Sequence, residues 1–162
     1  MGKKLILVRH GQAHNPDGNR DFDRALTQIG QRDTRHLGRW LSEVHHDMDH
    51  IISSSALRAK ETADNILDES KLGKVQFEDE LYEASVRTML ATVGGIDNDY
   101  QSVVLVGHNP TITFFADYLA AEPVSGMEPG TATIITFECE SWAELSQSSG
   151  VLIAQRRPSD DI

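Results

Sequence analysis

Three short clusters of basic and imidazole side chains have the chemistry to hold and attack a phosphoryl group. Arg9 and His10 follow a short apolar run. Arg58 lies one helical turn beyond a second such run, and His108 closely follows a third. Guanidinium groups match phosphate oxygens with paired hydrogen bonds and keep their charge at any relevant pH. A neutral imidazole, whose ordinary pKa is about 6.5, is a competent nucleophile toward phosphorus. These residue types indicate phosphoryl chemistry, provided that they meet in space.

The elements around these clusters predict that they do meet. Strands are predicted at Lys4–Val8, Ile51–Ser53, Val75–Glu78, Val103–Val106, Thr131–Phe137 and Val151–Gln155, and helices at a segment capped by Thr27, at Ala56–Glu69, at Ser85–Val93 and at Thr111–Ala121. Strands that alternate with helices predict an α/β fold with a mostly parallel sheet between helical layers. In such sheets ligands gather at the carboxyl ends of the strands, where all three clusters lie.

The composition predicts a soluble protein and argues against several kinds of partner. The 162 residues suit one domain, predicted at 1–158 with a frayed polar tail at 159–162. A formal net charge of −10 argues against nucleic acids and anionic membranes, which attract basic surfaces. The apolar runs are too short to cross a bilayer, and no signal-peptide pattern is present. A single cysteine, Cys139, excludes an intrachain disulfide, so a cytoplasmic location is expected.

The motifs resemble those of one enzyme family. Leu7–Gly11 resembles the signature of the histidine phosphatase superfamily, which has the phosphoglycerate mutase-like fold. Ser54–Ala63 and Val106–Pro110 are similar to its second and third motifs and occur in the same order. The resemblance covers nearly the whole chain. Together with the short length, the segment Asp23–Gly30 makes it most similar to the SixA-type phosphohistidine phosphatases.

This resemblance implies a fold, a mechanism and a set of site residues. The fold implied is a three-layer α/β/α sandwich. His10 becomes transiently phosphorylated, while Arg9, Arg58 and His108 hold the phosphoryl group. Water then attacks the phosphohistidine and releases phosphate, with neither a metal nor a cofactor required.

Two further residues have both a functional and a plainer interpretation. Glu83, after the third predicted strand, is the candidate general acid that protonates a leaving group; otherwise it is a solvated loop carboxylate. Larger members of the family take such an acid from an insertion. Phosphohistidine needs it less, because imidazole protonated on its far nitrogen leaves as a neutral molecule. Gln12, next to the signature, is expected either to line the pocket or to be an exposed loop side chain.

Plainer interpretations also exist for the charged residues. Arg58 could pair with Glu61 or Glu69 on a helix surface, and His108 could cap the following helix. Arg24 is expected to form a surface ion pair with Asp21 or Asp23 and not to touch a phosphorylated partner. A group of polar residues is expected to be a solvated helix end and not a metal site: His45, His46, Asp47, Asp49 and His50.

The sequence therefore predicts a phosphohistidine phosphatase that acts on a phosphorylated protein, such as a histidine-containing phosphotransfer domain. Two alternatives stay open. The first is a phosphomonoesterase for phosphoserine or for small phosphorylated metabolites. The second is a non-catalytic phosphate-binding module on the same fold. A mutase is disfavoured, because the chain lacks the length for a lid that would shield the phosphoenzyme from water.

Overall fold

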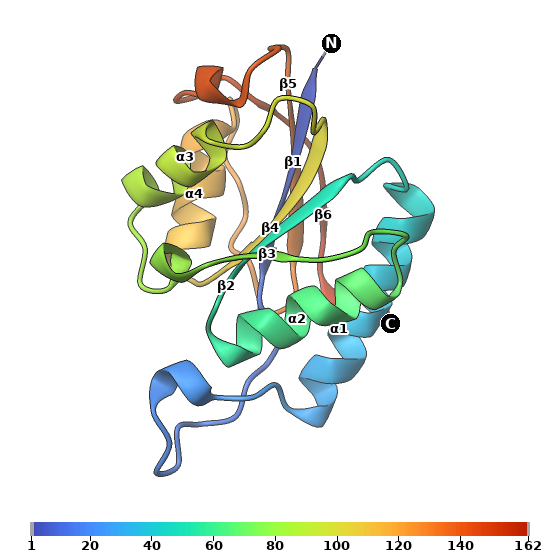
Figure 1. Ribbon diagram of the computed structural model, residues 1–162, viewed down its shortest axis with the longest axis vertical. Helices are drawn as coiled ribbons and strands as arrows, with labels where there is room; N and C mark the ends of the chain where they lie inside the picture. The colour runs from blue at the N-terminus through green and yellow to red at the C-terminus, as the bar shows by residue number, and fades with distance from the viewer. Residues whose placement is uncertain (1, 162) are drawn as a thin grey trace.

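A six-stranded sheet forms the centre of the computed structural model, which describes residues 2–161 (Figure 1). Its strands are β1 Lys3–Arg9, β2 His50–Ser54, β3 Gln76–Glu78, β4 Ser102–Gly107, β5 Ala132–Phe137 and β6 Val151–Arg156. Their order across the sheet is β3-β2-β4-β1-β5-β6. The first four in this order run parallel, whereas β5 is antiparallel to both of its neighbours. The predicted mostly parallel sheet is thus confirmed, with β5 as its antiparallel member.

Helices cover both faces of this sheet (Figure 1). They are α1 Gln28–Val44, α2 Leu57–Asp68, α3 Val86–Gly94 and α4 Thr111–Leu119. Side chains of a strand alternate between the two faces, so Ile6 and Val8 pack with residues of α1 and α2. Leu5 and Leu7 pack on the other face with residues of α3 and α4. The arrangement is the predicted three-layer α/β/α sandwich.

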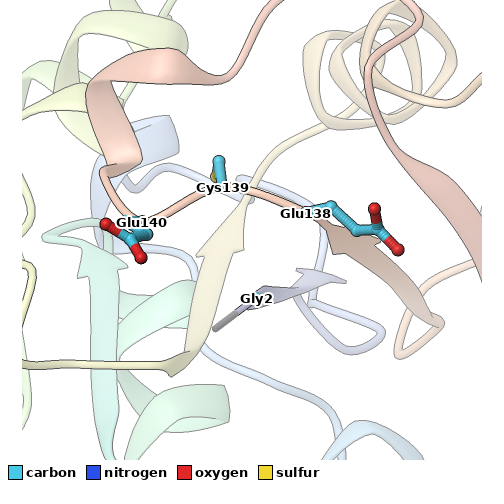
Figure 2. Close-up of a pocket in the computed structure, with 4 residues that line it drawn as sticks. All are labelled: Gly2, Glu138, Cys139 and Glu140. Atoms are coloured by element: carbon cyan, nitrogen blue, oxygen red, sulfur yellow. The ribbon is translucent and has the colours of Figure 1, made fainter.

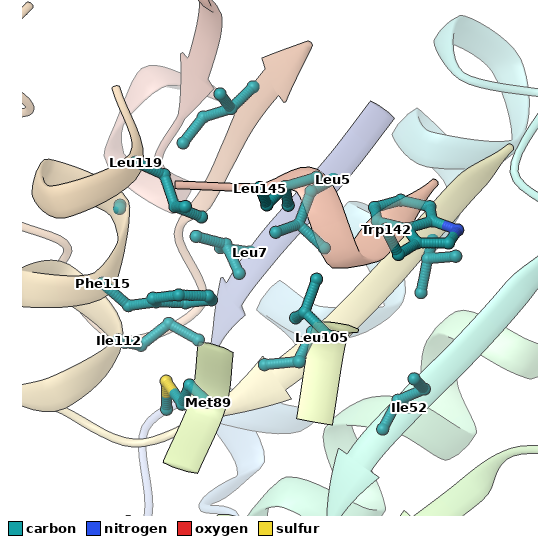
Figure 3. Close-up of a cluster of buried hydrophobic side chains, with 14 of the residues drawn as sticks. Leu5, Leu7, Ile52, Met89, Leu105, Ile112, Phe115, Leu119, Trp142 and Leu145 are labelled. Carbon is teal, nitrogen blue, oxygen red and sulfur yellow. The ribbon is translucent and has the colours of Figure 1, made fainter. Parts of the chain in front are cut away.

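The core between the sheet and the α3–α4 layer is closely filled (Figure 3). Leu7 and Leu105 from the sheet, Phe115 from α4 and Met89 from α3 are fully buried in it. Trp142 closes the cluster at the amino end of β1, where its indole nitrogen donates to the Tyr100 carbonyl at 2.9 Å. Fully burying an apolar side chain such as Leu7 or Phe115 stabilises a fold by roughly 1.5–3 kcal/mol. This core fixes the strands and hence the residues at their ends.

Side-chain caps begin two of the helices, and the one at Thr27 was predicted from the sequence. The Thr27 side chain accepts a hydrogen bond from the Gly30 amide at the start of α1. Ser85 does the same for the Thr88 amide at the start of α3. Each cap satisfies one of the amides that the first helical turn leaves without a partner.

A 3₁₀ turn, Pro158–Asp161, lies at the chain end, where the sequence predicts a polar tail. Ser159 donates to the Glu128 carboxylate at 2.8 Å, and the Arg157 amide donates to Asp160 at 2.9 Å. Residue 162, the last of the predicted tail, lies outside the described residues. Within residues 2–161 no helix combines the length and the apolar character that a membrane span requires.

Candidate active site

The carboxyl ends of three neighbouring strands bring the predicted site residues together. His10 directly follows β1, Ser54 ends β2 and His108 directly follows β4, which lies between them in the sheet. The imidazole rings of His10 and His108 lie 5.1 Å apart between centroids. Arg58, in the first turn of α2, places its Nε 3.3 Å from the Nε2 of His10. Side chains far apart in the sequence therefore share one site.

The imidazole of His10 is held in the form that a nucleophile needs. Its Nδ1 lies 2.8 Å from the Gly11 carbonyl oxygen, which can only accept, so Nδ1 carries the proton. Nε2 is left with its lone pair, toward which the Nε–H of Arg58 points. Burial lowers the pKa of His10 to about 3, and the charges of Arg58 and Arg9 act in the same direction. His10 is consequently neutral at pH 7, with Nε2 as the nucleophilic nitrogen.

This pKa leads to a direct test by nuclear magnetic resonance. Because burial lowers the pKa of His10 to about 3, lowering the pH from 8 to 5 should leave the imidazole neutral with its proton on Nδ1. The ¹⁵N chemical shifts of the ring report both protonation and tautomer, with the exposed His36 of α1 as a reference resonance. A midpoint near 6.5 for His10, or a proton on Nε2, would contradict the arrangement.

His108 is arranged to donate a hydrogen bond. Its Nε2 lies 2.8 Å from the Ser54 hydroxyl, which itself accepts from the Ala56 amide at 3.2 Å. Nε2 is the acceptor that the Ser54 hydroxyl contacts among the described residues, so we assign the hydroxyl proton to this hydrogen bond and the ring proton to Nδ1. This Nδ1 is buried and has no hydrogen-bond partner within residues 2–161. Burial lowers the pKa of His108 to about 4, so a neutral ring offers one N–H to whatever enters the site.

The two arginines supply positive charge near His10. Arg58 is 6% exposed, and its terminal nitrogens donate to Asp21, at 2.7 Å to the carbonyl and 3.0 Å to the carboxylate. It pairs with neither glutamate considered from the sequence. Arg9 donates from Nη1 to the Met127 carbonyl at 3.0 Å, whereas its buried Nε has no partner among the described residues. Free guanidinium donors therefore remain for an anion.

A cavity of about 340 Å³ opens at this site. It is lined by Asp21, Arg58, Leu81, Tyr82, Glu83, Ala84, Met89, His108, Asn109, Pro110 and Thr111. Glu83 is exposed and adopts a φ of 57°, a left-handed conformation uncommon for a residue with a side chain. Glu83 is one of the residues that line the cavity, and its role as a general acid stays a hypothesis. Arg9, His10 and Gln12 are not among these lining residues. Gln12 is exposed, and its side-chain amide oxygen accepts from the Thr27 hydroxyl at 2.7 Å.

Three site residues were not singled out for a role by the sequence. Ser54 orients His108, and Asp21 and Tyr82 form a hydrogen-bonded pair at the cavity, with the Tyr82 hydroxyl 2.6 Å from the Asp21 carboxylate. The sequence signalled only that Asp21 could pair with Arg24, which it does at 2.9 Å. Asp21 and Arg58 are 37 positions apart, and no pattern in the sequence indicates that they are in contact.

The polar group at the end of α1 serves structural contacts. Lys4 lies 2.7 Å from the Asp47 carboxylate and 3.0 Å from the Nδ1 of His45. His50 contacts Gln76 and stacks on Tyr100 with ring centroids 4.2 Å apart. In the described part of the chain, no three histidine, cysteine or acidic residues are grouped so as to hold a metal ion.

A second hollow, of about 410 Å³, lies at the opposite end of β1 (Figure 2). Its lining comes from Gly2, just before β1, and from Glu138, Cys139 and Glu140, just after β5. Burial raises the pKa of the Cys139 thiol, so the unreactive protonated form is favoured. Carboxylates repel a phosphate dianion, and this hollow has the wrong charge for phosphoryl chemistry.

The fold and the motifs define a class of protein. The model of the histidine phosphatase superfamily (branch 1) matches residues 5–90, more than half of the chain, and the chain belongs to this superfamily. The protein is therefore a phosphatase, in agreement with the sequence prediction and against the non-catalytic alternative. Over 161 residues it is 26% identical to an uncharacterized protein of Mycobacterium tuberculosis, covering 93% of this chain and 99% of that protein. A 64-residue segment is 39% identical to the mitochondrial serine/threonine-protein phosphatase PGAM5 of Xenopus laevis, covering 40% of this chain and 23% of that protein.

Within this class, solved structures show the similarity to SixA proteins. A protein assigned as the phosphohistidine phosphatase SixA of Nakamurella multipartitia has a TM-score of 0.84 and 28% identity, covering 98% of this chain and 97% of that one. The protein histidine phosphatase SixA complexed with tungstate also has a TM-score of 0.84, at 21% identity, covering 98% of this chain and 99% of that one. The predicted resemblance to SixA-type proteins is confirmed.

Proposed function

We propose that the protein is a phosphohistidine phosphatase that acts on a phosphorylated protein, such as a histidine-containing phosphotransfer domain, through a phosphohistidine on His10. One observation carries the proposal. The lone pair of His10 Nε2 faces the Nε–H of Arg58, the charge of Arg9 acts on the same ring, and the nearby His108 has a buried Nδ1 with no hydrogen-bond partner within residues 2–161. The site thus combines a neutral nucleophile with donors for the charge that develops on phosphoryl oxygens.

The first half of the reaction transfers the phosphoryl group to the enzyme. Nε2 of His10 attacks phosphorus, and the bond from phosphorus to the substrate imidazole breaks. The bonding electrons return to that imidazole, which leaves as a neutral molecule because its far nitrogen already carries a proton. On the enzyme, the new phosphoimidazole is positively charged, and the Gly11 carbonyl stabilises its Nδ1–H at 2.8 Å. Arg9, Arg58 and His108 donate to the phosphoryl oxygens.

In the second half, water attacks the phosphorus of the phosphohistidine and inorganic phosphate leaves. The bond from Nε2 to phosphorus breaks, and its electrons restore the lone pair of His10. The proton lost by the water goes to the departing phosphate. No residue has to protonate a leaving alkoxide in either half, so the reaction does not depend on Glu83.

The rim of the cavity favours a histidine leaving group. Glu83 places an exposed carboxylate among the lining residues. The carboxylate of Asp21, whose pKa is held well below its usual range by the hydrogen bond from Tyr82 and then by one from Arg24, is paired with Arg24 and Arg58. Negative rim charge suits an imidazolium N–H and disfavours an anionic leaving group. The 28% identity to a protein assigned as SixA over nearly the full length supports the same substrate class.

A phosphomonoesterase for phosphoserine or small metabolites is the second candidate. The observation in its favour is that the exposed Glu83 lines the cavity, where its carboxyl group could protonate an alkoxide. The partial match to the serine/threonine-protein phosphatase PGAM5 also supports it. In this case Glu83 is a catalytic residue.

A comparison of two peptides tests these functions. We expect kcat/KM for a phosphohistidine peptide to exceed that for a phosphoserine peptide of the same sequence by about 10²-fold or more, the rate that a general acid typically contributes. Release of inorganic phosphate by the full chain is the measurement. Glu83→Gln should lower the phosphoserine rate more than the phosphohistidine rate, with the exposed Glu80→Gln as matched control. A preference for phosphoserine would replace the first candidate by the second.

A further inference from the structure

Asp21 is the most connected acidic residue at the site. Its carboxylate accepts from Arg58 at 3.0 Å, from Arg24 at 2.9 Å and from the Tyr82 hydroxyl at 2.6 Å. Its carbonyl oxygen accepts from Arg58 at 2.7 Å. Asp21 lies in the 3₁₀ turn Asp21–Asp23, on the loop between β1 and α1 that is drawn in blue at the lower left of Figure 1. An exposed loop residue thus holds a buried arginine.

The two bonds to Asp21 fix the direction of the Arg58 guanidinium. A guanidinium has five N–H donors in one plane, and Asp21 takes one on each terminal nitrogen. The Nε–H then faces His10 Nε2 at 3.3 Å, and one N–H stays free on each terminal nitrogen. The edge held by Asp21 is not the edge that faces the nucleophile. Asp21 therefore orients the guanidinium of Arg58 and leaves N–H donors for a phosphoryl oxygen.

We propose that Asp21 is a positioning residue that holds the outer edge of Arg58, so that its inner edge meets the phosphoryl group as it transfers to His10. The proposal rests on the phosphatase chemistry above and adds to it a residue outside the sequence motifs. Without Asp21, a long arginine side chain regains rotamer freedom that binding must then remove. The Tyr82 hydroxyl, on another segment that lines the cavity, donates to the same carboxylate.

The test compares two acidic residues of the same turn. Asp21→Asn and Asp21→Ala remove the charge or the side chain that holds Arg58. Asp23→Asn is the matched control, because Asp23 is exposed and pairs with Arg20 at 3.0 Å. We expect Asp21→Ala to lower kcat/KM for a phosphohistidine peptide by about 10- to 100-fold, the cost of a misplaced catalytic group. The affinity for tungstate should fall in parallel, whereas Asp23→Asn should match the wild type in both measurements.

Two further variants separate positioning from a loss of folding. Tyr82→Phe keeps the aromatic ring, removes only the hydroxyl on Asp21 and should show a smaller loss in the same direction. In an Arg58→Lys background, Asp21→Ala should have little further effect, because an ammonium group has no planar set of N–H donors that a carboxylate could orient. An equal loss in both backgrounds would contradict the positioning role.

The outcomes also separate this inference from the proposed function. If the wild-type chain hydrolyses neither peptide, the proposed function fails and the inference with it. If the wild type is active but the Asp21 variants behave like Asp23→Asn, only the positioning role is wrong. Tighter tungstate binding by the Asp21 variants would show that Asp21 competes with the phosphoryl group, and would likewise overturn the proposal.

Discussion

Replacing His10 with alanine should abolish hydrolysis, with a fall in kcat of about 10⁴- to 10⁶-fold, the range seen when a covalent nucleophile is deleted. The physical reason is that His10 is neutral, carries its ring proton on Nδ1 and directs the lone pair of Nε2 at the Nε–H of Arg58. Phosphate release from a phosphohistidine peptide is the measurement. His36→Ala, a change at an exposed position of α1, is the control and should retain full activity.

The same variant tests the covalent intermediate. Wild-type protein mixed with substrate and quenched in alkali should carry an acid-labile phosphoryl adduct, and His10→Ala should carry none. An adduct of undiminished amount in His10→Ala would assign the nucleophile to another residue. Activity that survives in the variant without any adduct would point to direct attack by water.

The second largest effect is expected at Arg58. Its removal takes away a buried positive charge beside the nucleophile, and losing one stabilising donor of a transition state costs about 10²- to 10³-fold in kcat. Arg58→Ala should also raise the pKa of His10, since the charge of Arg58 contributes to lowering it. Arg35→Ala, on the exposed face of α1, serves as the control.

The two effects at Arg58 can be measured separately. Steady-state kinetics with a phosphohistidine peptide gives the loss in rate, and the ¹⁵N shifts of His10 give the change in pKa. A variant that keeps wild-type kcat/KM would remove Arg58 from the phosphoryl site. A loss in rate with an unchanged His10 pKa would mean that the guanidinium acts on the substrate alone.

Much of the fold follows from local pattern in the sequence. Buried strands such as Val103–Val106 are continuous apolar runs, and helix starts carry recognisable caps at Thr27 and Ser85. The order of the strands across the sheet does not follow from local pattern, because it depends on how the helices cross over the sheet. No residue in β5 signals that this strand runs antiparallel to β1. The polar composition of the tail likewise gives no sign of the 3₁₀ turn Pro158–Asp161.

The site was predictable to the extent that its residues sit at strand ends. Arg9, His10 and His108 belong to this group, and their convergence follows from the parallel strands that precede them. Ser54 and Asp21 act on other side chains, and such contacts depend on rotamers and loop paths that the sequence does not encode locally. Gln12 illustrates the same point, since the direction of its side chain is decided by the Thr27 hydroxyl.

The unpartnered N–H groups of Arg9 and His108 bear on how the resting protein and its ligand complex differ in stability. An oxyanion that accepts hydrogen bonds from these two nitrogens would bind the folded chain and not the unfolded one. Mass action then raises the melting temperature as the ligand concentration increases.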